Sequence, residues 1–281
     1  MTDLAKLRKK INILHPFLKK GSIDKSIVTF LKSKIDEIIP FLSVPIFDTE
    51  FMEIHRITIN KKIKEVGNNR ITFIKHLKYP HESYVKKYGR ANYNYQSRFY
   101  GTFDPMTALK EMKPDIGDVI TESIWRLKNF NSLKVAPIFM ITSINNGQSH
   151  NELSLRFKIG YENLMAKYSN NEASQFQEVL LFIAECFAKE VDYENSYDYF
   201  LSSFLSNKIF NEINNGEVEA IVYPSVPSEL GFSNIVIKPA SFDSKYELKY
   251  VNEKRIISTK SWYLNITGHS SKFVSDKLLW D

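Results

Sequence analysis

The order in which helix and strand patterns follow one another is the strongest constraint on the fold of this chain. In the first 42 residues apolar side chains recur at three- and four-residue steps, the spacing of a helix face. From Phe51 the pattern changes: FMEIHRITI alternates as a half-buried strand does. Further strand patterns come in groups on either side of one group of helices. Because helices and strands do not alternate one by one, we expect an α+β fold with a mixed or mainly antiparallel sheet.

The N-terminal pattern predicts two helices, separated near Pro16 and Gly21. Ser22 is the expected cap of the second helix, and Pro40 is expected to end it. We therefore predict an N-terminal helical hairpin over residues 1–42 that packs on the main domain. A surface for dimerisation or for a partner protein is the alternative interpretation.

Residues 51–281 show no linker that divides them, so we expect one further domain. Asp104 is expected to cap a short helix that begins at Pro105. We interpret the Asn- and Ser-rich pieces between residues 141 and 174 as loops around a middle segment. The remaining predicted helices are 176–187 and 197–213, and the remaining predicted strands are 97–103, 119–127, 133–141, 218–225, 232–239, 245–256 and 261–268.

The composition excludes several classes of protein and leaves an ordinary globular one. With 43% hydrophobic and 25% charged residues among 281, the chain has enough apolar side chains for a core. The single cysteine, Cys186, excludes an internal disulfide and a cysteine-based metal site, and the six histidines lack a paired spacing. No signal peptide pattern and no run of 18 apolar residues is present, so we expect a cytoplasmic protein without a metal. The net charge of +6 favours anionic partners.

The stretch from Lys86 to Glu111 combines four tyrosines with several basic residues. This mixture is typical of proteins that bind single-stranded RNA, and it also suits a dinucleotide site. The glycine-rich phosphate loops, the H-E-x-x-H motif and the G-x-S-x-G motif are all absent. The common nucleotide, metalloprotease and serine-hydrolase signatures therefore do not apply.

Arg56 lies on the face of its predicted strand that also carries Met52 and Ile54, so it should point partly inward. An inward arginine needs either a carboxylate of the protein or a phosphate of a ligand. Taken singly, Tyr100 on a strand, Glu111 on a helix and Ser225 at a strand end have ordinary structural explanations.

The order of these residues resembles the RES domain family, which includes toxins of bacterial toxin–antitoxin systems that degrade NAD. The resemblance covers about residues 51–240. It is carried by Arg56, the G-R-A-N run with Arg90, Phe99-Tyr100, the T-A-L-K-E run ending in Glu111, Tyr223-Pro224-Ser225, and Asn234-Ile235-Val236. Ala91 and Tyr88 depart from the family pattern, which has an aromatic residue and a glycine there. The hairpin, residues 145–175 and the β-strand extension from 241 to 281 are additional to short family members.

The resemblance implies a fold similar to ADP-ribosyltransferase toxins and cleavage of the nicotinamide–ribose bond of NAD. ADP-ribose would pass to phosphate or water, which makes the chain an NAD phosphorylase or an NAD glycohydrolase, with NAD as substrate and no cofactor. Glu111, Arg56 and Ser225 would be catalytic, and Arg90, Tyr100 and Asn234 would bind substrate. The implied partner is an antitoxin protein with a DNA-binding domain.

Two other functions stay open at this point. One is a single-stranded RNA-binding module, and the other is an inactive RES-like interaction protein. The hypothesis of an NAD-degrading enzyme predicts no direct contact with nucleic acid or membrane, and it leaves homo-oligomerisation open.

Overall fold

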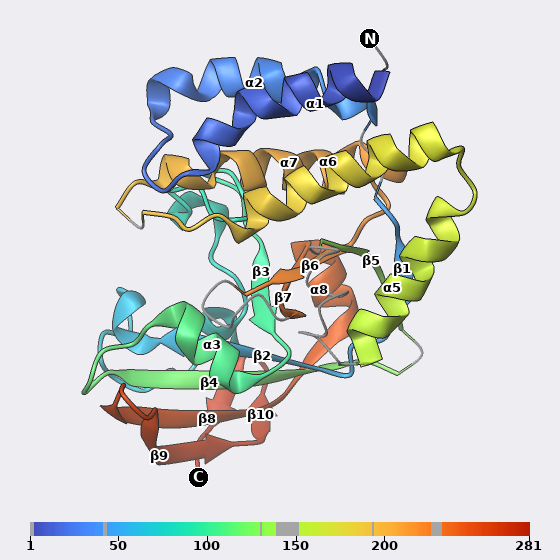
Figure 1. Ribbon diagram of the computed structural model, residues 1–281. Helices are drawn as coiled ribbons and strands as arrows, with labels where there is room; N and C mark the ends of the chain where they lie inside the picture. Colours follow the sequence, from blue (N-terminus) through green and yellow to red (C-terminus); the bar gives the residue numbers. More distant parts are fainter. Residues whose placement is uncertain (1–2, 42–43, 130, 139–151, 193, 226–231) are drawn as a thin grey trace. The chain divides into compact units, whose positions relative to one another are not determined.

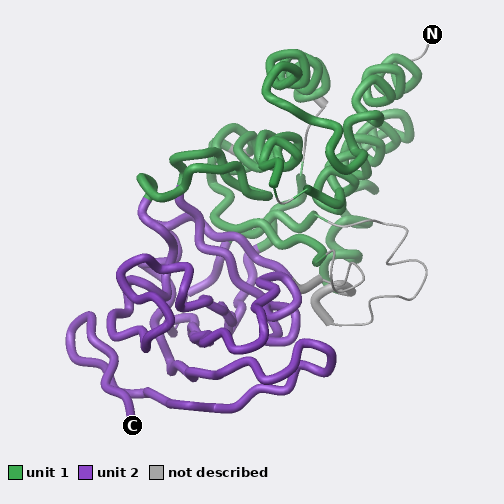
Figure 2. Tube along the Cα trace, turned by 90° about the vertical axis from the view of Figure 1, so that its left-hand side faces the viewer, with its two compact units in different colours: residues 1–47, 82–96, 134–232 green, residues 48–81, 97–133, 233–281 purple. Residues whose placement is uncertain are grey.

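The computed structural model shows a chain that divides into two compact units, each built from three separate segments (Figures 1 and 2). Unit 1 contains residues 1–47, 82–96 and 134–232, and unit 2 contains residues 48–81, 97–133 and 233–281. The residues that the structure describes are 3–41, 44–129, 131–138, 152–192, 194–225 and 232–281.

Along the described residues, helices and strands do not alternate one by one, as is typical of an α+β protein. The helices are α1 (Asp3–Leu14), α2 (Val28–Asp36), α3 (Pro105–Met112), α5 (Glu152–Met165), α6 (Asn170–Ala188), α7 (Phe200–Asn211) and α8 (Pro239–Lys245). The strands are β1 (Phe47–Thr49), β2 (Glu53–Ile59), β3 (Phe99–Thr102), β4 (Val119–Leu127), β5 (Leu133–Pro137), β6 (Ala220–Pro224), β7 (Phe232–Ile237), β8 (Tyr246–Ser258), β9 (Tyr263–Ser270), β10 (Lys272–Val274) and β11 (Lys277–Leu279).

Strand pairing is mixed and mostly antiparallel, as the sequence predicts. In unit 2 the strands run in the order β7-β3-β2-β4-β8-β9, and each pair is antiparallel. In unit 1, β5 and β6 pair in parallel. The separate hairpin of β10 and β11 is antiparallel. The α+β class is therefore confirmed.

The N-terminal helices are present and pack within unit 1. Helix α1 contacts α2 and α6, and α2 also contacts α7 (Figure 1). Their apolar stripes are buried, with Leu7, Leu14, Leu31 and Ile35 at most 1% exposed. Burial on this scale is what stabilises helices too short to form alone. These contacts support the interpretation of the hairpin as a packing element.

The predicted cap of the second helix is wrong. Ser22 instead donates through its hydroxyl to the carbonyl oxygens of Phe17 and Lys19. The capping side chain is Asp24, which accepts from the amides of Ser26 and Ile27 at the start of a 3-10 turn that leads into α2. Asp24 is also a favoured capping residue, and it satisfies the free amides at this helix start.

The loops predicted between residues 141 and 174 are replaced in part by helix. Residues 141–151 lie outside the described residues, but α5 and the first turns of α6 occupy most of the remainder. Ser169 and Glu172 form a capping box, in which each side chain accepts from the other residue's amide. This polar start belongs to a helix terminus, which explains why the composition looked like a loop.

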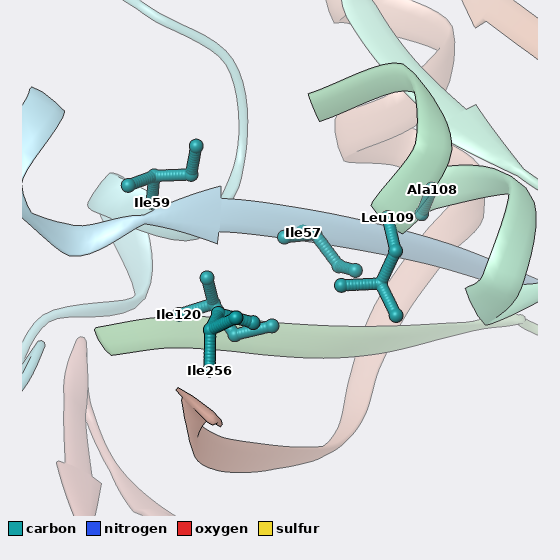
Figure 3. Close-up of a cluster of buried hydrophobic side chains, with 6 residues drawn as sticks. All are labelled: Ile57, Ile59, Ala108, Leu109, Ile120 and Ile256. Atoms are coloured by element: carbon teal, nitrogen blue, oxygen red, sulfur yellow. The ribbon is translucent and has the colours of Figure 1, made fainter. Parts of the chain in front are cut away.

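The strands of unit 2 carry a helix on each face. On one face, Ala108 and Leu109 of α3 join a buried cluster with Ile57 and Ile59 of β2, Ile120 of β4 and Ile256 of β8 (Figure 3). On the other face, Phe242 of α8 stacks on Phe99 at 3.8 Å between ring centroids and lies 4.8 Å from the Trp125 ring. Because side chains alternate along a strand, residues of β2 with odd numbers face α3 and Arg56 projects from the opposite face.

Glycine is required where β3 meets β2. A Cβ at Gly101 would lie 2.3 Å from Cγ2 of the buried Ile54 and 3.2 Å from the carbonyl oxygen of His55. The backbones therefore approach each other at the point where His55 pairs with Thr102.

Candidate functional site

Glu111, the residue on which the predicted chemistry depends, lies in the last turn of α3 and is half-buried. Its Oε1 accepts a hydrogen bond of 2.7 Å from Nδ2 of Asn234 on β7. Asn234 is 4% exposed, so its amide is held in place by its surroundings. The structure thus brings together two predicted site residues that are 123 positions apart.

The local sequence explains where Glu111 is placed. Asp104 caps α3 by accepting from the amides of Met106 and Thr107, and Pro105 is the first helical residue, as predicted. Lys113 ends the helix in the left-handed conformation. Ala108 and Leu109 anchor the helix in the apolar cluster. The carboxylate therefore comes from a short helix that is fixed at both ends and on one side.

Strand register puts Asn234 in a row of side chains on the α3-facing side. Asn234 pairs with Thr102, Thr102 pairs with His55, and His55 pairs with Ile124. Directly opposed residues on neighbouring antiparallel strands share a face, with about 5 Å between their Cβ atoms. Asn234 and His55 are therefore about two such steps, roughly 10 Å, apart on one surface.

Arg56 lies on β2 and is half-buried. One guanidinium nitrogen, Nη1, donates to the carbonyl oxygen of Tyr100 at 2.7 Å, and the guanidinium carbon lies 5.6 Å from the centre of the Phe99 ring. Burial lowers the pKa of Arg56 from 12.5 to about 10, although the nearby Tyr100 side chain partly opposes this shift.

The partners of Arg56 differ from the ones that the sequence suggested. Among the described residues no carboxylate lies within ion-pair distance of Arg56, and its buried Nε has no hydrogen-bond partner. A buried cationic group with an unused donor is costly unless an anion meets it. Of the two options raised by the sequence, an internal carboxylate is thus excluded for the described part of the chain.

Tyr100 lies on β3, beside Arg56, and is half-buried. The buried Arg98 lies two residues earlier, and burial lowers its pKa while the Tyr100 side chain raises it. Tyr100 therefore lies within electrostatic range of two guanidinium groups. This neighbourhood suits a site for negatively charged groups.

Arg90 belongs to unit 1 and contacts backbone groups there. Its Nη1 donates to the carbonyl oxygens of Phe187 at 2.5 Å and Lys189 at 3.3 Å, at the C-terminal end of α6. Its guanidinium carbon lies 5.3 Å from the centre of the Tyr199 ring. A cation at a helix C-terminus stabilises the helix, so Arg90 has a structural role in this state.

Ser225 also belongs to unit 1. It follows β6 directly and is fully buried. The structure therefore groups Arg56, Tyr100, Glu111 and Asn234 in unit 2, and Arg90 and Ser225 in unit 1.

Sequence reasoning missed a charged cluster on the α3-facing side of unit 2. The carboxylate of Glu122 on β4 contacts Nδ1 of His55 at 3.1 Å and Nζ of Lys254 on β8 at 2.5 Å. Burial by itself raises the pKa of Glu122, but hydrogen bonds from His55 and Lys254 outweigh it and lower the pKa to about 2. The three residues lie on strands distant in sequence, so no local motif could have revealed them.

Comparison with models of known protein families finds no match, and comparison with characterised proteins finds no relative. No helix in the described part of the chain is long and apolar enough to cross a membrane. Nor do the described residues contain a group of three or more His, Cys, Asp or Glu side chains arranged to hold a metal ion.

Proposed function

We propose that this chain cleaves the nicotinamide–ribose bond of NAD and transfers ADP-ribose to water or phosphate. The observation that carries the proposal is the Glu111 carboxylate, held by the buried Asn234 amide on the strands that also carry Arg56 and Tyr100. These residues belong to the motifs that carry the resemblance to the RES domain family, which also rests on the G-R-A-N run and on Tyr223-Pro224-Ser225.

The chemistry explains why one oriented carboxylate is central. NAD carries a cationic pyridinium at the anomeric carbon, so its leaving group needs no proton. Positive charge grows on the ribose as the bond breaks, and a carboxylate near the 2-hydroxyl stabilises that charge more than it stabilises the ground state. The amide of Asn234 holds one carboxylate oxygen of Glu111 and so orients the carboxylate.

The resemblance assigns Arg56 to the pyrophosphate, although its side chain projects from the face of the sheet opposite α3 and Glu111. Its guanidinium is held by the Tyr100 carbonyl through one nitrogen, while Nε lacks a partner among the described residues. A guanidinium fork matches phosphate oxygens, and a buried one interacts strongly with them. In this proposal Tyr100 lines the site, while substrate binding by Arg90 and catalysis by Ser225 rest on the resemblance alone.

The biological role that fits this activity is a cytoplasmic bacterial toxin with an ADP-ribosyltransferase-like fold. Unrestrained cleavage of NAD would harm the cell that makes the enzyme. The proposed restraint is an antitoxin protein that carries a DNA-binding domain, while the chain itself contacts neither DNA nor membrane.

Incubation of the purified chain with NAD tests the proposal by measuring released nicotinamide, with and without inorganic phosphate. We expect Glu111→Gln to slow release by roughly 10²- to 10³-fold, because an oriented electrostatic group is lost. The matched control is Glu162→Gln on α5, a 60% exposed side chain with Oε1 3.9 Å from Nζ of Lys158. If a folded Glu111→Gln variant released nicotinamide at the wild-type rate, the proposal would be wrong.

A single-stranded RNA site is the second candidate, favoured by one exposed group in unit 1. Tyr84 and Tyr95 are 71% and 58% exposed, and Nζ of Lys86 lies 4.5 Å from the centre of the Tyr95 ring. Exposed rings beside lysines can stack on unpaired bases. RNA affinity that falls steeply with salt, without nicotinamide release from NAD, would support this candidate over the enzyme.

A further inference from the structure

The buried cluster around Glu122 contains a histidine that a purely structural ion pair would not need. Glu122 is 3% exposed and is neutralised by Lys254, which contacts Oε2 at 2.5 Å. The other carboxylate oxygen, Oε1, contacts Nδ1 of His55 at 3.1 Å. The lysine already balances the carboxylate charge, so the histidine is not required for neutralisation.

The contact with Glu122 fixes the orientation of His55. An ionised carboxylate only accepts hydrogen bonds, so Nδ1 of His55 is the donor and carries the proton. In the neutral ring this leaves Nε2 with a free lone pair. Within the described residues Nε2 has no hydrogen-bond partner, and the His55 side chain is 18% exposed. An oriented imidazole with an open Nε2 is the form in which histidine accepts a proton from a nucleophile.

His55 also lies on the surface that carries the proposed catalytic carboxylate. It shares a row with Thr102 and Asn234, and Asn234 holds Glu111. Asn234 and His55 are roughly 10 Å apart in this row. Inverting glycosidases, in which water attacks an anomeric carbon directly, separate their two catalytic carboxyl groups by roughly 6.5–9.5 Å, which leaves room for that water. The charged groups that face His55 from neighbouring elements are Glu122, Lys254 and, ahead of α3, Asp104.

We propose that His55, positioned by Glu122, is the general base of the reaction and that water is therefore the acceptor. This inference rests on the proposed NAD cleavage. The bond between ribose C1 and the nicotinamide nitrogen breaks, and its electron pair neutralises the pyridinium. The water oxygen bonds to C1, and its proton passes to Nε2 of His55 and then to solvent. Inorganic phosphate dianion would attack without losing a proton, so a phosphorylase has no need of this base.

The experiment follows nicotinamide release from NAD in phosphate-free buffer for the full chain and two variants. We expect His55→Asn to slow release about 100-fold, the lower end of the effect of a lost general base. The matched control is His269→Asn on β9, because His269 also makes an Nδ1 contact with a neighbouring strand, to Oδ1 of Asn252 at 2.8 Å. We expect that variant to match the wild type. Added phosphate should partly restore release by His55→Asn, because a nucleophile without a proton bypasses the base.

A second measurement uses the unaltered protein, in case His55→Asn does not fold. The rate of hydrolysis should fall with decreasing pH as one group takes up a proton. The same fall should be absent when phosphate is the acceptor and the concentration of its dianion is kept constant.

The outcomes separate this inference from the proposed function. Release by His55→Asn at the wild-type rate, or a rate without the acid limb, would overturn the assignment of His55 and leave NAD cleavage intact. An equal loss with and without phosphate would also overturn it, because it would indicate a structural role. Absence of release by the wild type would remove the proposed function and this assignment together.

Discussion

The two units use buried charge in different ways. In unit 1, Lys189 and Asp198 form an ion pair of 2.8 Å with side chains 1% and 0% exposed. The second oxygen of Asp198 accepts from the amides of Gly21 and Asp192, at 2.6 and 3.0 Å. In unit 2, by contrast, Arg56 has an unpartnered Nε and His55 has an open Nε2 among the described residues.

This difference separates polar groups that hold the chain from polar groups that remain available to a ligand. The Asp198 carboxylate joins helical segments of unit 1 to the turn after α1, and its acceptor sites are used by the protein itself. A fully satisfied buried pair stabilises one arrangement and offers nothing to substrate. The partly satisfied groups of unit 2 cost stability unless a ligand completes them, which is typical of functional sites.

The largest effect on stability is expected from breaking the buried ion pair of Lys189 and Asp198. Asp198→Ala leaves Lys189 charged and buried, and should lower the free energy of unfolding by about 3–5 kcal/mol. Urea unfolding followed by circular dichroism measures it. The exposed pair of Lys208 and Glu212 is the control, and Glu212→Gln should cost less than about 0.5 kcal/mol. Equal effects of the two substitutions would contradict the comparison.

Acid should weaken unit 2 through Glu122. Its pKa is lowered from 4.5 to about 2 in the folded chain, so its contribution is complete above about pH 4.5 and is lost as the pH falls towards 2. The loss should reach about 3 kcal/mol from this group. Unfolding free energies measured from pH 6 to 2.5 test this, with Glu122→Gln expected to flatten the dependence. An equally steep dependence in that variant would assign the effect to other carboxylates.

A smaller effect is expected at the start of α3. Asp104→Ala removes the acceptor for the amides of Met106 and Thr107, which should cost about 1 kcal/mol. Asp104→Asn keeps an acceptor oxygen and serves as the control in the same urea titration. Because this helix carries Glu111, nicotinamide release should fall in the alanine variant more than in the asparagine variant.

The smallest effect on stability is expected at the site itself. Glu111→Gln keeps an oxygen that can accept from Asn234, and the side chain is half-buried, so stability should change by less than about 0.5 kcal/mol. Thermal unfolding of this variant beside the wild type provides the measurement. A loss of more than about 2 kcal/mol would place Glu111 with Asp198, among the groups that hold the fold.

Sequence patterns predicted the elements whose signals are local. The strand 119–127 matches β4 residue for residue, and Asp118 and Lys128 flank its two ends. Asp104 and Pro105 likewise mark the start of α3. By contrast, α5 was missed because its polar surroundings resemble a loop.

The contacts of the candidate site residues could not be predicted from the sequence. The resemblance names Glu111 and Asn234, but their hydrogen bond depends on how α3 and β7 are placed. The partner of Arg56 is a backbone carbonyl, which no residue type in the sequence announces. The Glu122 cluster depends on the register of β2, β4 and β8, and register follows from pairing between distant segments.

Unit 2 consists of three segments that are separated in the sequence, and this arrangement determines when the candidate site can form during synthesis. Glu111 and His55 leave the ribosome early, but Asn234 and Lys254 follow only after the long segment 134–232 of unit 1 has been made. A nascent or prematurely terminated chain therefore lacks the residues that orient both Glu111 and Glu122. If the proposed NAD cleavage is correct, activity would begin only after translation has passed Lys254.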